Sequence, residues 1–67
     1  MTRKKVEEII SFISDYEPDF EITFGIGNTK LVLHSEGTFE FDNETLTYQH
    51  LERFVCIDYK YIQYIDF

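Results

Sequence analysis

Apolar and polar residues alternate along the segment FEITFGI, where Phe20, Ile22, Phe24 and Ile26 occupy every second position. Successive side chains of a strand point to opposite faces of its sheet, so this period of two predicts a strand with one buried face. Residues 27–28, Gly-Asn, follow directly, and a Gly in the first loop position is what a type II′ hairpin turn requires. The segment is therefore expected to form the first strand of a β-hairpin.

The hairpin turn at 27–28 sets the register of the next strand. Phe24 falls opposite Leu31 on the apolar face, and Glu21 falls opposite His34 on the polar face. A one-residue slip would send every apolar side chain of the second strand into water. The register therefore predicts that Glu21 and His34 form a surface pair.

Two further turns continue the pattern. A three-residue loop at 35–37, with Gly37 in the left-handed position of a bulge, would set Leu33 against Phe39. A turn at 43–44 would then place Phe41 opposite Leu46. Each of the three turns is inferred from its own residues, and together they place all apolar side chains on one face. This agreement favours a continuous antiparallel meander.

An amphipathic helix precedes the strands. One helical face carries Val6, Ile9, Ile10 and Ile13, with Tyr16 one step further along. Thr2 is suited to cap the helix and Pro18 ends it, so we expect a helix from about residue 3 to residue 16. Its apolar stripe is suited to lie across the apolar face of the sheet.

The charges of this helix run against its dipole. Arg3, Lys4 and Lys5 lie at the positive end of the macrodipole, and Asp15 and Glu17 lie at the negative end. Each such charge costs about 0.3 kcal/mol at an exposed site. Salt screens terms of this size, so the arrangement is either tolerated or serves a partner.

The C-terminal third is less regular. The unbroken apolar run FVCI at 54–57 predicts a strand covered on both faces, with Cys56 as a small buried apolar residue. Ile62 and Ile65 favour a tight turn that leads into a short final strand, although residues 49–67 also allow a helical segment. The expected strands cover residues of about 20–26, 30–34, 38–42, 45–49, 53–58 and 62–66.

These elements predict an α+β domain in which an N-terminal amphipathic helix packs on a four- to five-stranded antiparallel meander. The order of elements is similar to that of small SH3-like or Sm-like barrels, and the meander could curl into one. The residues carry no family signature, because position 34 is His where a sharply bent barrel strand needs Gly. No uridine-pocket signature follows Phe39 either.

Composition supports one small domain. The chain has 67 residues, of which 43% are hydrophobic and 18% aromatic, enough for the dense core that so short a chain needs. A single cysteine excludes an internal disulfide, and the N-terminus lacks the features of a secretion signal, so we expect a cytoplasmic protein. No apolar run is long enough for a membrane span.

The chain is strongly acidic. Thirteen Asp and Glu residues outnumber six Lys and Arg, for a formal net charge of −7. Such a surface repels phosphate, so direct binding of nucleic acid is not expected. The charge either keeps the protein dispersed or imitates nucleic acid towards a basic partner.

No catalytic, metal or cofactor site is evident. His34, His50 and Cys56 lack the spacing of a zinc site, and the GIGNT loop joins two strands without a following helix that could receive phosphate. No nucleophile and base can be paired. We therefore expect a protein that is not an enzyme and that carries no cofactor.

The remaining candidate for a functional feature is a protein-binding surface. Tyr59, Tyr61, Tyr64 and Phe67 crowd the C-terminal segment, and tyrosine is enriched at the centres of protein interfaces. A final strand also leaves an edge that can pair with a second copy or with a partner. The leading hypothesis is a small acidic protein-interaction module, a regulator or inhibitor that binds a protein partner through these aromatic residues and self-associates through the C-terminal edge strand.

Two alternatives remain open. In the first, the protein mimics nucleic acid and blocks a DNA- or RNA-binding protein with acids that include Glu36, Glu40, Asp42 and Glu44. In the second, a small barrel binds nucleic acid itself through Arg3, Lys4 and Lys5.

Overall fold

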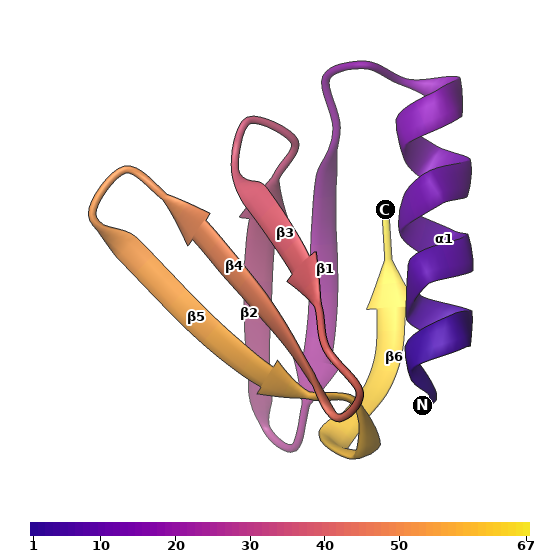
Figure 1. The fold of residues 1–67 in the computed structure, drawn as a ribbon, viewed down its shortest axis with the longest axis vertical. Coiled ribbons are helices and arrows are strands. Elements are labelled where there is room, and N and C mark those ends of the chain that lie inside the picture. The colour runs from indigo at the N-terminus through magenta and orange to yellow at the C-terminus, as the bar shows by residue number, and fades with distance from the viewer.

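A computed structural model describes residues 1–67, the whole chain. The elements in chain order are α1 (Arg3–Tyr16), β1 (Glu21–Ile26), β2 (Thr29–His34), β3 (Thr38–Phe41), β4 (Thr45–His50), β5 (Arg53–Asp58), the 3₁₀ turn η1 (Tyr59–Tyr61) and β6 (Ile62–Asp66). The fold is α+β, with one α-helix beside two antiparallel three-stranded sheets. Figure 1 shows the β3–β4–β5 sheet in front of β1 and β2, with α1 on the β6 side of the molecule.

Helix α1 begins and ends where its sequence signals lie. The Thr2 hydroxyl accepts a hydrogen bond from the Lys5 backbone N–H at 3.2 Å and so caps the first turn. Glu17, the residue before Pro18, has an extended backbone and ends the helix. No helix of the structure has both the length and the apolar character needed to cross a membrane.

The β1–β2 hairpin has the register expected from the alternating pattern. Phe24 pairs with Leu31, and Glu21 pairs with His34. Gly27 has φ of 59°, the left-handed value that a glycine supplies in the first loop position. Strand β6 pairs with the other side of β1, so the final segment is a strand and β1 is central in its sheet.

The β3–β4 hairpin also agrees with the expected register. Phe41 pairs with Leu46, and the Asp42 N–H donates to the Thr45 carbonyl at 2.9 Å across the two-residue turn. Strand β5 then pairs with β4 to complete the second sheet.

The expected pairing of β2 with β3 is wrong. Strand β2 pairs only with β1 and β3 only with β4, so the chain changes sheets at residues 35–37 instead of forming a hairpin there. The Ser35 N–H donates to the Phe20 carbonyl at 2.9 Å, which extends the β1–β2 end of the first sheet and directs the chain away. The result is two sheets without a closed barrel, in place of one continuous meander.

The prediction that β5 is covered on both faces is also wrong. Phe54 is 65% exposed and Cys56 is exposed, whereas Ile57 is buried. Strand β5 is an edge of its sheet, and no further layer covers its outer face. Cys56 is therefore a surface thiol and not part of the core.

One core joins the helix to both sheets. Tyr48 is fully buried, and its hydroxyl accepts a hydrogen bond from the His34 N–H at 3.0 Å. Twelve buried side chains form a single cluster, namely Val6, Ile10, Ile13, Phe20, Ile22, Phe24, Leu33, Leu46, Tyr48, Ile57, Tyr59 and Ile62. Every element except β3 contributes to this cluster, and Phe39 and Phe41 of β3 pack against it.

Substitution of Gly37 tests the change of sheets. A Cβ at Gly37 would collide with the Tyr48 ring, which is buried and cannot move aside, so we expect Gly37→Ala to lower the free energy of unfolding by about 1–3 kcal/mol. A Cβ at Gly25 would meet the ring of Tyr64, which is 41% exposed and free to rotate outward. Urea denaturation should show a smaller loss for Gly25→Ala. Equal losses would contradict the role given to Tyr48.

Substitution of Leu51 tests backbone strain in the β4–β5 turn. Leu51 has φ of 55° and is 87% exposed, so it adopts a left-handed backbone without gaining burial. Asn tolerates this conformation, and we expect Leu51→Asn to raise the free energy of unfolding by about 1 kcal/mol. The same substitution at Phe54, which is exposed but lies in a strand, should give no such gain in a thermal melt.

Candidate functional site

The aromatic residues expected at one C-terminal surface lie in four different environments. Tyr59 is only 3% exposed, and its hydroxyl donates to the Asp42 carbonyl at 2.8 Å, so it belongs to the core. Burial raises the pKa of the Tyr59 phenol above its ordinary value. Tyr64 lies over Gly25 on the outer face of its sheet, Tyr61 lies in η1, and Phe67 lies near α1. The structure does not bring the four rings together.

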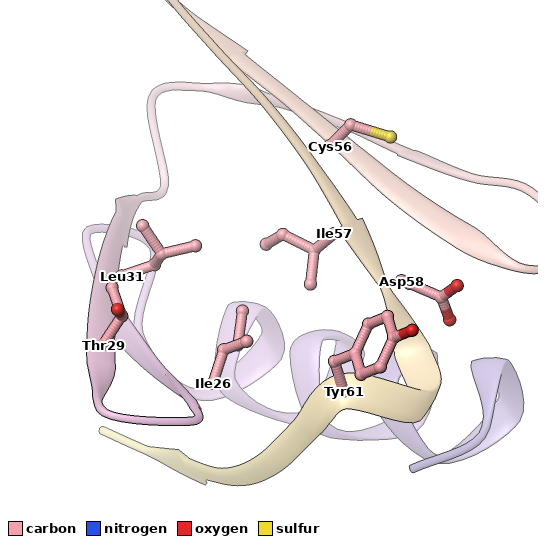
Figure 2. A pocket seen from close by; sticks show the side chains of 7 residues that line it. All are labelled: Ile26, Thr29, Leu31, Cys56, Ile57, Asp58 and Tyr61. Atoms are coloured by element: carbon pink, nitrogen blue, oxygen red, sulfur yellow. The ribbon is translucent and has the colours of Figure 1, made fainter.

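Tyr61 lines an apolar cleft between the two sheets. The cleft has a volume of about 290 Å³ and is lined by Ile26, Thr29, Leu31, Cys56, Ile57, Asp58 and Tyr61. Figure 2 shows Leu31 and Ile57 pointing towards each other across the cleft, with Ile26 and Tyr61 below them. The sulfur of Cys56 points away from these apolar side chains (Figure 2).

Both walls of the cleft are edge strands. Strand β2 is the outer strand of one sheet and β5 is the outer strand of the other, so neither has a strand partner on its free side. A single hydrogen bond links the two edges, from Arg53 Nη1 to the Val32 carbonyl at 2.6 Å. Arg53 lies at the start of β5, whereas the cleft residues lie at its end, so this bond leaves the cleft open.

The polar groups of the cleft have structural roles. The Asp58 carboxylate accepts a hydrogen bond from the Lys60 N–H at 3.1 Å and caps η1. It also lies 3.9 Å from Lys60 Nζ. The cleft therefore offers an apolar floor and two strand edges, and its one carboxylate caps η1.

The four acids singled out from the sequence lie along β3 and its two flanking turns. Glu36 precedes the strand, Glu40 lies within it, and Asp42 and Glu44 follow it, all with exposed side chains. Arg3 of α1 reaches this end of β3, where its Nη1 donates to Asn43 Oδ1 at 3.2 Å. The four carboxylates therefore lie along one edge strand and its flanking turns, with a cation near one end.

Arg3 itself is already engaged. Its Nε donates to Glu7 Oε1 at 2.9 Å, and this hydrogen bond raises the pKa of the guanidinium. Lys4 and Lys5 remain as the exposed cations of the N-terminal segment.

The structure brings together two histidines that are far apart in the sequence. The ring centroids of His34 and His50 lie 6.1 Å apart, and His34 Nδ1 lies 3.6 Å from Glu21 Oε2, as the register predicted. No group of three or more His, Cys, Asp or Glu side chains is placed to hold a metal ion. The histidine pair depends on the meeting of two sheets, and no local sequence signal could have revealed it.

Helix α1 carries an exposed pair of aromatic residues that the apolar stripe did not predict. Phe12 is 60% exposed and Tyr16 is 78% exposed, with ring centroids 6.0 Å apart. Tyr16 therefore lies off the buried stripe that it was expected to extend. A hollow of about 310 Å³ is lined by Phe12, Ile13, Tyr16, Glu17 and Phe67. The signal available in the sequence was the spacing of Phe12 and Tyr16, one helical turn apart and outside the Val6, Ile10 and Ile13 stripe.

Comparison with protein-family models, with curated proteins and with solved structures finds no significant match to this chain.

Proposed function

We propose that this protein is a small, non-enzymatic interaction module of the cytoplasm that binds an extended apolar segment of a protein partner in the cleft between β2 and β5. The observation that carries the proposal is the cleft itself, in which Tyr61, 59% exposed, stands beside the apolar side chains of Leu31 and Ile57. A regulator or inhibitor could act by capturing such a segment.

The free edges of β2 and β5 support binding of an extended chain. An edge strand presents a row of unpaired backbone N–H and C=O groups, and an added peptide strand satisfies them. Side chains that alternate along the peptide would then enter the apolar floor at every second position. Backbone pairing supplies affinity in this mode, and the pocket supplies selectivity.

Tyr61 has the character of an anchor residue. A tyrosine covers a large contact area with few rotatable bonds and keeps a polar tip for a hydrogen bond. Lys60 Nζ lies 5.2 Å from the Tyr61 ring centroid, a cation–π contact at the rim of the cleft. A partner that covers Leu31 and Ile57 would therefore also contact Tyr61.

Truncation of Tyr61 tests the cleft. With immobilised protein and nuclease-treated lysate of the native host, we expect Tyr61→Ala to lower retention of cleft-bound partners by at least about tenfold, as for an interface anchor. Phe54→Ala is the matched control, because Phe54 is similarly exposed at 65% but does not line the cleft. Quantitative mass spectrometry of the retained proteins measures both effects.

Two outcomes would count against the cleft. Retention that falls equally for both variants would indicate a general loss of fold or a different surface. Retention that is unchanged for Tyr61→Ala, in a variant with an unaltered melting temperature, would remove Tyr61 from the interface.

A second candidate function is mimicry of nucleic acid by the carboxylates along β3. Glu36, Glu40, Asp42 and Glu44 are all exposed, in a chain with a net charge of −7. A row of negative charges along a strand and its turns is suited to a basic cleft that normally binds phosphates.

Salt separates the mimic from the cleft binder. If the protein mimics nucleic acid, its partner should leave the immobilised protein as salt rises, and DNA should compete for the same partner. The variant that replaces all four acids with Gln or Asn should lose the partner, whereas Tyr61→Ala should keep it. A partner that resists salt and tolerates the fourfold replacement would exclude mimicry.

Direct nucleic-acid binding and self-association through the C-terminal strand are each supported by a single feature. Direct nucleic-acid binding by a small SH3-like or Sm-like barrel would rely on Lys4 and Lys5, because Arg3 is held by Glu7 and Asn43. Self-association through the C-terminal strand is supported by the position of β6 at the edge of its sheet.

A further inference from the structure

The outer side of α1 combines exposed aromatic residues with charges that oppose the helix dipole. Phe12 and Tyr16 are 60% and 78% exposed. The first turn of the helix contains no acidic residue and the last turn contains no basic residue. Cations at the N-terminus and anions near the C-terminus both destabilise an isolated helix.

Of the charges that oppose the dipole, all but Arg3 lack an ion-pair partner within the chain. The ion pairs of the structure are Arg3 with Glu7, His34 with Glu21 and Lys60 with Asp58. Lys4, Lys5, Asp15 and Glu17 are exposed and take part in none of them. No ion pair within the chain therefore stabilises these four charges.

We propose that two copies of this chain associate through α1, with the two helices antiparallel about a two-fold axis that passes midway between Ile10 and Ser11. Such an axis makes the same surface serve on both copies, so the contact is closed and gives a dimer. The helix dipoles are then antiparallel, and the basic end of each helix lies beside the acidic end of the other.

The register follows from the positions of the residues along α1. Ile9 and Phe12 are equally far from the midpoint, so Ile9 of one copy lies level with Phe12 of the other. By the same count Lys5 lies level with Tyr16. Lys4 lies within two positions of the level of Asp15 in the other copy, and at about 3.6 residues per turn both side chains lie on the same side of α1. An apolar centre, a cation beside an aromatic ring and an ion pair thus repeat on both sides of the axis.

The hollow beside Phe12 adds shape to this charge pattern. It has a volume of about 310 Å³ and is bounded by the Phe12 and Tyr16 rings on the helix and by Phe67 beyond β6. A side chain of the partner copy would enter it next to the projecting Phe12 ring. An exposed ring and a hollow therefore lie side by side on the same face.

The dimer contact is independent of the cleft proposed for the protein partner. The cleft is lined by residues of β1, β2, β5 and η1 and their turns, and none of its residues lies on α1 or at Phe67. A dimer built through α1 would carry two such clefts. Failure of either proposal leaves the other untouched.

A charge swap tests the antiparallel pairing by sedimentation velocity over a concentration series at low ionic strength. The wild-type chain should be a dimer at the higher concentrations. Lys4→Glu places two acids together at both ends of the contact and should weaken association by at least about tenfold. Asp15→Lys should do the same with two cations. The double variant Lys4→Glu/Asp15→Lys restores opposite charges and should recover the dimer.

Stability measurements separate loss of the contact from loss of the fold. Each single charge change matches the helix dipole better than the native residue, so the melting temperature of the monomer should stay constant or rise. Phe12→Ser should also abolish the dimer, whereas Phe54→Ser, at a site of similar exposure on β5, should retain it.

Three results would overturn the proposal. They are a wild-type chain that stays monomeric over the whole concentration series, a dimer indifferent to Lys4→Glu, and a double variant that fails to recover the dimer although both single variants lose it.

Discussion

The fold depends on the place where the Tyr48 side chain joins the two sheets. Tyr48 lies in β4 of one sheet, is fully buried, and accepts a hydrogen bond from the His34 N–H at the end of β2 in the other. Its ring leaves no room for a Cβ at Gly37, the residue through which the chain passes between sheets. The ring of Phe39 lies 5.1 Å from it, centroid to centroid. The Tyr48 side chain thus contacts both ends of the segment that connects β2 to β3.

The same contact explains which parts of the fold the sequence predicted. The registers of the β1–β2 and β3–β4 hairpins follow from two-residue turns and alternating side chains, which are local properties. Residues 35–37 satisfy a bulged hairpin equally well by local criteria. The choice between a hairpin and a change of sheets depends on the ring of Tyr48, more than ten positions away, so no local pattern decides it.

The candidate site was less predictable than the fold, because it depends on which way side chains point and on which edges meet. The C-terminal segment is rich in tyrosine, but Tyr59 belongs to the core while Tyr61 lies at the rim of the cleft. The apolar run at 54–57 indicated a buried strand, yet β5 is an edge strand with Cys56 exposed. The cleft exists because the β2 and β5 edges face each other, and residues from both sheets are needed to form it.

The grouping of the exposed apolar residues carries more weight than their number. A chain of 67 residues has a large surface for its volume, so exposure of some large apolar side chains is unavoidable. Single residues such as Phe54 and Leu51 are explained in this way. Surface area alone does not explain why Phe12, Tyr16 and Phe67 surround one hollow while Tyr61 borders another. Apolar side chains gathered around concave surfaces are suited to contact another chain, and this protein has two such surfaces on separate elements.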